Sequence, residues 1–115
     1  MNIRDSKAET TLEFSVEPAI LAQACQDVLA KIGSVTSVSR ETGTIAGHVG
    51  VFWCWGGRGN ISLRIAKRET LIELHIQTSH TEGLTMGKRA ATDLAKFTEA
   101  LGQDERLKGK ATGGW

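Results

Sequence analysis

The segment that decides the fold is residues 61–77, which read ISLRIAKRETLIELHIQ. Its apolar positions, on the two sides of a Lys-Arg-Glu turn, are Ile61, Leu63, Ile65, Ile72, Leu74 and Ile76. An apolar residue at every second position is typical of a strand that buries one face. The segment therefore predicts two antiparallel strands with one apolar and one polar face. Leu71, Glu73, His75 and Gln77 are expected to point away from the core.

Further strands are expected on the N-terminal side of this hairpin. Residues 10–16 alternate in the same way and would bury Leu12, Phe14 and Val16. Residues 34–40 are rich in Val, Ser and Thr, and the turn at 41–43 leads into another extended run that begins at Thr44. Residues 79–83 are expected to form a loop.

Two helices flank the strands. Residues 18–32 carry an apolar stripe at helical spacing, with Pro18 suited to the first turn and Gly33 to the stop. A closing helix, capped by Thr85, ends at Gly102. Its apolar stripe consists of Met86, Ala90, Leu94, Phe97 and Leu101.

The element order is β-α-β-β-β-β-α, or one strand fewer if one strand is long and bent. Two helices with apolar stripes and a sheet with one apolar face can all bury their apolar surfaces when both helices pack on the same side of the sheet. The fold class is therefore α+β, an antiparallel sheet of four or five strands with two helices on one face and the other face open. We expect a loose N-terminus at residues 1–9, a single domain at 10–102, and a flexible tail at 103–115 that contains glycine and lysine and ends in Trp115.

The order resembles the β-α-β4-α topology of a single TATA-binding-protein-like repeat, also described as a helix-grip arrangement. Several motifs between residues 40 and 101 are similar to uncharacterised bacterial domains. They are Glu-Thr-Gly-Thr-Ile-Ala-Gly at 41–47, the Trp-Gly that precedes 61–65, Thr-Ser-His at 78–80, Gly87-Lys88, and 97–101. The Asp-Trp-Gly-Lys-Asn form of those domains is Thr-Met-Gly-Lys-Arg here, at 85–89. The resemblance implies a fold, and topology alone does not carry a function.

Composition narrows the range of partners. The chain has 115 residues, with 14 Lys and Arg against 13 Asp and Glu, so no basic field favours nucleic acid. No apolar run approaches the ~20 residues that cross a bilayer, which speaks against a membrane span. The absence of a secretory-type start and the small number of cysteines predict a cytoplasmic protein.

The open sheet face gathers groups that could bind a ligand. The expected register places Glu13, His48, Arg64, Glu73, His75 and Gln77 on that face. Two imidazoles and two carboxylates are competent ligands for a divalent ion, but no tight metal-binding spacing is present. A solvated sheet face has the same composition.

A glycine-rich segment at 52–60 carries two tryptophans. If Ile45, Val49, Val51, Trp53 and Trp55 share one face, His48, Phe52 and Cys54 fall on the other, although bulges at the glycines could exchange the faces. Trp53 and Trp55 could line a ligand pocket or anchor a partner; alternatively, one of them closes the end of the core and the other lies at the sheet edge. Arg58 and Arg64 with these rings could hold single-stranded nucleic acid by stacking and charge.

Two further residues are candidates for reactivity or binding. Cys54 is the candidate nucleophile, since Cys25 lies in the apolar stripe of the first helix. Trp115, behind two glycines, could dock in a pocket of its own chain or of a neighbouring one, or lie free.

The leading hypothesis is a non-enzymatic binding or interaction module that self-associates and has a small apolar ligand or a protein as a possible further partner. No catalytic residue, metal or cofactor is assigned. The residues expected to bind are Trp53, Trp55, Arg58, Asn60, Arg64, His75 and Trp115. One alternative is a metal-binding or thiol enzyme that uses His48, His75 and Cys54; another is a single-strand nucleic-acid binder.

Overall fold

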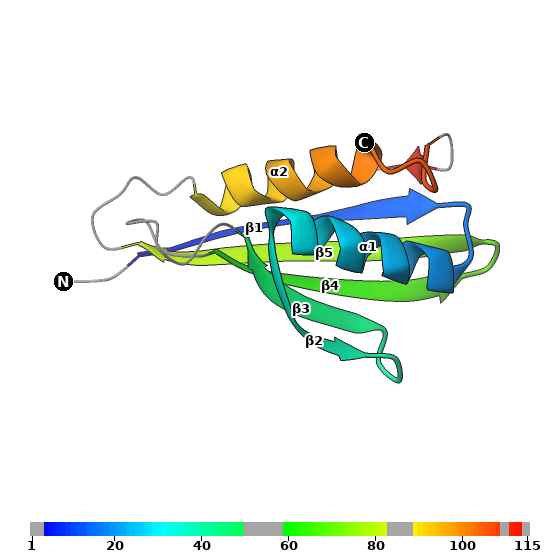
Figure 1. The fold of residues 1–115 in the computed structure, drawn as a ribbon, viewed down its shortest axis with the longest axis horizontal. Coiled ribbons are helices and arrows are strands. Elements are labelled where there is room, and N and C mark those ends of the chain that lie inside the picture. The colour runs from blue at the N-terminus through cyan, green and yellow to red at the C-terminus, as the bar shows by residue number, and fades with distance from the viewer. Residues whose placement is uncertain (1–3, 50–58, 83–88, 109–110, 114–115) are drawn as a thin grey trace.

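The computed structural model describes residues 4–49, 59–82, 89–108 and 111–113 (Figure 1). In chain order the elements are β1 (Arg4–Phe14), α1 (Pro18–Ile32), β2 (Gly33–Ser39), β3 (Thr44–Val49), β4 (Gly59–Arg68), β5 (Leu71–Glu82), α2 (Arg89–Gly102) and β6 (Ala111–Gly113). In these described ranges, five long strands and two helices match the expected α+β class and element order, and a short sixth strand is added at the end.

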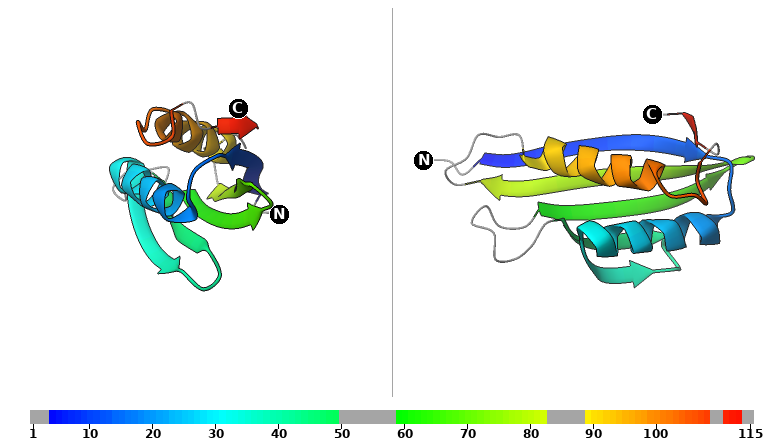
Figure 2. Two further views of the ribbon diagram at one scale, coloured as in Figure 1. Left: turned by 90° about the vertical axis from the view of Figure 1, so that its right-hand side faces the viewer. Right: turned by 45° about the horizontal axis from the view of Figure 1, so that its top comes forward.

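The strands form one antiparallel sheet in the order β2-β3-β4-β5-β1-β6. Both helices lie on the same side of it, as the end-on view shows (Figure 2). Helix α1 packs over β2, β3 and β4, and helix α2 packs over β1, β4 and β5. Within the described residues, the second face of the sheet carries no helix, as predicted from the two apolar stripes.

The register follows from the alternation of apolar residues. Leu74 pairs with Leu12 of β1, and Leu63 pairs with Ile76 of β5 and with Ile45 of β3. A shift by one residue would move each strand's apolar set to the open face, so burial selects this register. The fully buried centre consists of Leu12, Phe14, Leu21, Leu29, Leu63, Leu74, Ile76, Phe97 and Leu101.

The boundary between α1 and β2 is a direct passage from helix to strand. Pro18 occupies the first turn of α1, as expected, and the helix ends at Ile32. Gly33 has an extended backbone, with φ at −174°, so it does not act as a left-handed cap. A Cβ at this position would overlap the carbonyl oxygen of His48, which explains why the close approach of β2 and β3 requires glycine.

The two ends of the domain differ from the sequence expectation. Residues 4–9, expected to be loose, belong to β1 and pair with β5, which runs on through residues 79–82 that were expected to form a loop. In the expected tail, Leu107 is only 2% exposed, and β6 pairs with the end of β1. Residues 4–9, 79–82 and 111–113 are ordered by backbone hydrogen bonds to a neighbouring strand, which leave no signal in hydrophobic periodicity, whereas Leu107 packs in the core.

Candidate functional site

The open face of the sheet collects the polar side chains that the sequence assigned to it. The burial pattern of β3 alternates, with Ile45 and Val49 buried toward the helices, so His48 lies on the opposite face. The strand register places the other expected residues on this same face. They are Glu13, Arg64, Glu73, His75 and Gln77.

Three of the expected binding residues lie together on this face. Arg64 of β4 is directly paired with His75 of β5, and Asn60 is four residues before Arg64 on β4, opposite Ser79. Residues directly opposite in an antiparallel pair have Cβ atoms ~5 Å apart, so Arg64 and His75 form one neighbourhood. The other four, Trp53, Trp55, Arg58 and Trp115, lie outside the described residues, as does Cys54.

His75 is positioned by its neighbours on β1. Its Nδ1 lies 3.0 Å from the hydroxyl oxygen of Thr11, and its Nε2 lies 3.6 Å from a carboxylate oxygen of Glu9. The His75 and Glu9 side chains are 42% and 62% exposed, so their contact adds little to stability and mainly orients the imidazole.

Most charges on the open face are segregated by strand; the exception is Lys7, a cation on β1. The carboxylates belong to β1 and β5, at Glu9, Glu13 and Glu73, whereas the guanidinium groups belong to β4, at Arg64 and Arg68. Arg68 donates to Glu73 at 3.2 Å, but Arg64 and Glu13 form no ion pair within the described part of the chain. One side of this face is therefore acidic and the adjacent strand is basic.

The two histidines of the metal hypothesis do not meet. His48 pairs with Asn60, which pairs with Ser79, so His48 and His75 are two strands and four residues apart. Standard sheet spacings convert this into a separation of roughly 17 Å, too far for one ion. Within the described residues, no three His, Cys, Asp or Glu side chains are grouped so that they could hold a metal.

The layer between the sheet and the helices is filled by side chains. Phe97 and Leu101 of α2 are fully buried against the sheet, and Thr78 donates to the carbonyl of Ala90 at 2.7 Å. The buried carboxylate of Asp93 approaches Gly59, where a Cβ would overlap it. Asp93 was not among the residues expected at a site, although its spacing to Ala90 and Phe97 places it on the buried stripe of the helix.

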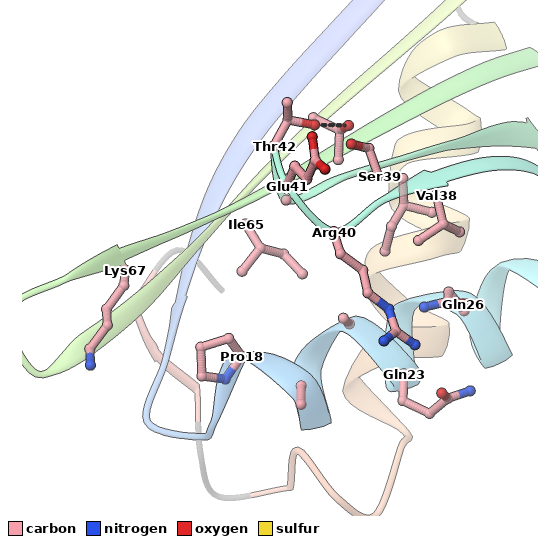
Figure 3. A pocket seen from close by; sticks show the side chains of 15 residues that line it. Pro18, Gln23, Gln26, Val38, Ser39, Arg40, Glu41, Thr42, Ile65 and Lys67 are labelled. Atoms are coloured by element: carbon pink, nitrogen blue, oxygen red, sulfur yellow. Dashed lines mark hydrogen bonds between the residues drawn. The ribbon is translucent and has the colours of Figure 1, made fainter.

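A groove that the sequence analysis did not predict lies between α1 and the β2–β3 hairpin. It has a volume of about 580 Å³, and Figure 3 shows its side chains converging from the helix, the hairpin and β4. Gly43, with φ at +68°, allows the tight turn that brings the hairpin over the helix. No local sequence pattern predicts this groove, because it joins elements that are separated in the chain.

Cys25 is inert under ordinary conditions. It is fully buried in α1, and burial together with the nearby Asp104 carboxylate raises the pKa of its thiol to about 12. A thiolate is the reactive form, so this residue is not a nucleophile.

Arg106 joins the segment after α2 to α1. It donates to Asp104 at 2.7 Å and to Asp27 at 2.9 Å. Hydrogen bonds from Gln23 and Arg106 lower the pKa of Asp27, and those from Arg106 lower the pKa of Asp104. The charges of these groups are thus used to hold the fold together.

Comparison with known proteins gives a fold. No family model matches the chain, and no curated protein sequence matches it. Among solved structures, Ara h 8.0201 is similar with a TM-score of 0.56 and 12% identity, over 88% of this chain and 97% of that one. DynU16, from the dynemicin biosynthetic locus, is similar with a TM-score of 0.53 and 11% identity, over 93% of this chain. The chain spans about half of DynU16, with 49% of that structure covered.

These likenesses support the helix-grip arrangement expected from the element order and add no sequence family. Identities of 11% and 12% carry information on the fold alone. No helix in the described part of the chain is long and apolar enough to cross a bilayer.

Proposed function

We propose that the protein is a non-enzymatic binding module that associates with a second copy of itself through the open face of the sheet. The observation that carries the proposal is the segregation of charge on this face. Arg64 and Arg68 lie on β4, next to β5 with Glu73, and β1 on the far side of β5 carries Glu9, Glu13 and one cation, Lys7.

A two-fold axis turns this segregation into complementarity. If the axis runs along the strands between β4 and β5, β4 of each copy faces β5 of the other. The arginines of one sheet then face β5 of its partner, which carries Glu73, and the same contacts occur twice. Opposite potentials across an interface guide association and select the partner.

The size of the face agrees with what a stable dimer needs. Strands of 6 to 12 residues rise ~3.3 Å per residue and are spaced ~4.8 Å apart, so the five long strands present roughly 700 Å². A standard interface buries about 800 Å² per partner. The open face is therefore about large enough to be one half of a dimer contact.

Light scattering after size exclusion tests the proposal. We expect a dimer at low salt that dissociates as the ionic strength rises toward ~0.5 M, because exposed charges are screened. Arg64→Glu combined with Arg68→Glu should give a monomer, as should Glu73→Lys, which reverses the charge of β5. Mixing the two variants should restore a heterodimer, because the reversed charges are complementary again.

The matched control is Lys96→Glu, an exposed charge reversal on α2 that should leave the dimer intact. A wild-type protein that stays monomeric at every salt concentration, or a dimer that the control disrupts equally, would contradict the proposal. Trp53, Trp55, Arg58 and Trp115 are proposed to extend the contact. Deletion of residues 114–115 tests Trp115 and leaves β6 in place.

A further inference from the structure

The groove between α1 and the β2–β3 hairpin has the size of a small-molecule site. Its volume of about 580 Å³ falls within the ~300–1,000 Å³ of ligand pockets in proteins. It lies on the helix side of the sheet, away from the open face, so a ligand there does not depend on self-association. The side chains of α1 that line it include Pro18, Gln23 and Gln26 (Figure 3).

The inner surface of the groove is mostly apolar. Ala22 and Ile65 are half-buried, and Ile45 is buried beneath them. Val38 on β2 is 43% exposed in the groove wall. Ile20 of α1, at 40%, is the other large hydrophobic side chain exposed in the described part of the chain. An apolar ligand body would remove such surface from water, which is favourable.

The rim of the groove carries a guanidinium that is not used by the fold. Arg40 extends from the hairpin toward Gln23 and Gln26 of α1, across the mouth of the groove (Figure 3). Within the described part of the chain, Arg40 makes no ion pair or side-chain hydrogen bond. Lys67 adds a second positive charge at another edge of the groove, against one carboxylate at Glu41.

We infer that this groove binds a small molecule with an apolar body and a single carboxylate. The apolar floor takes the body, and the planar fork of Arg40 accommodates the carboxylate, whose two oxygens match its N–H donors. With two cations and one anion on the rim, the groove favours a monoanion over a neutral or a cationic ligand.

The test compares octanoate with octanol, which share an apolar chain and differ in charge. Each is titrated into the ¹⁵N-labelled protein, and amide chemical shifts are followed by NMR. We expect octanoate to shift the amides of α1 and of the β2–β3 hairpin, and to bind more tightly than octanol.

Variants separate recognition of the carboxylate from the apolar contact. Arg40→Gln should weaken octanoate binding by roughly 10-fold, because loss of hydrogen bonds to a charged group lowers affinity by at least this factor. Octanol binding should be unchanged. Arg40→Lys, which keeps the charge and loses the fork, should fall in between. Arg40 is exposed, so neither change threatens folding, and Lys96→Gln on α2 is the matched control.

Three outcomes would overturn the inference. Octanoate could bind no better than octanol, its shifts could fall outside the groove, or Arg40→Gln could weaken both ligands equally. The first shows no selection of the carboxylate, the second assigns binding to another site, and the third gives Arg40 a structural role only.

Discussion

The packed interior makes a quantitative prediction at Phe97. This side chain is 0% exposed at the centre of α2, between the helix and the sheet. Phe97→Ala removes a phenyl ring from a filled layer, which costs the transfer free energy of the lost atoms and that of the cavity left behind. The expected loss in the free energy of unfolding is about 3–5 kcal/mol.

This loss is large relative to the whole stability. A chain of 115 residues is expected to have roughly 6–17 kcal/mol at ~0.05–0.15 kcal/mol per residue. In urea, with a slope of ~1.5 kcal/mol per molar, a loss of about 4 kcal/mol lowers the unfolding midpoint by roughly 2.7 M. Urea unfolding followed by circular dichroism measures this shift directly. Lys96→Ala, on the exposed side of the same helix, should change stability by no more than ~0.5 kcal/mol.

Benzene provides an independent readout. An apolar cavity in a protein core stays dry and binds benzene, so saturation with benzene should raise the midpoint of the Phe97→Ala variant and leave the wild-type protein unchanged. A loss below ~1 kcal/mol together with no benzene effect would refute the reasoning, because it would mean that the layer is not packed at this position.

Two further predictions concern ionisable groups. Because the pKa values of Asp27 and Asp104 are lowered in the folded protein, their contribution to stability is present above the unfolded pKa of ~3.9 and is lost as the pH falls below it. Arg106→Gln should therefore be less stable than wild type at pH 7, with the difference narrowing in acid unfolding experiments below about pH 4; an unchanged difference would contradict the ion-pair account. With its pKa raised to about 12, Cys25 should react with iodoacetamide at pH 8 at least ~1,000-fold more slowly in the folded protein than in urea. Peptide mass mapping distinguishes it from Cys54, and comparable rates would show that the thiol is accessible.

Particular residues show which features of the fold hydrophobic periodicity predicts and which it does not. The alternation at 61–77 predicted correctly that Glu73, His75 and Gln77 share a face with Arg64, because a period of two permits only one assignment once the apolar set is buried. The same reasoning missed the strand at residues 4–9. Its polar side chains give no burial signal, and it is ordered by backbone pairing with β5.

The two candidate sites also differ in whether the sequence could predict them. Arg64 and His75 could be placed together from the sequence because they lie on consecutive strands of one hairpin, where the turn sets the register. The groove at Arg40 could not be predicted from the sequence. It depends on how α1 packs against the β2–β3 hairpin, and hydrophobic periodicity does not determine the distance between these two elements.

The sequence by itself determined the kind and order of the two helices and five long strands and the faces that they bury, because these follow from local hydrophobic periods of two and 3.6 residues. Only the tertiary structure decided the strand order β2-β3-β4-β5-β1-β6, the filled layer around Phe97, the separation of His48 from His75 and the groove beneath Arg40. These features depend on contacts between segments far apart in the chain. Such contacts are selected by packing and hydrogen bonding of the whole domain, which no local pattern encodes.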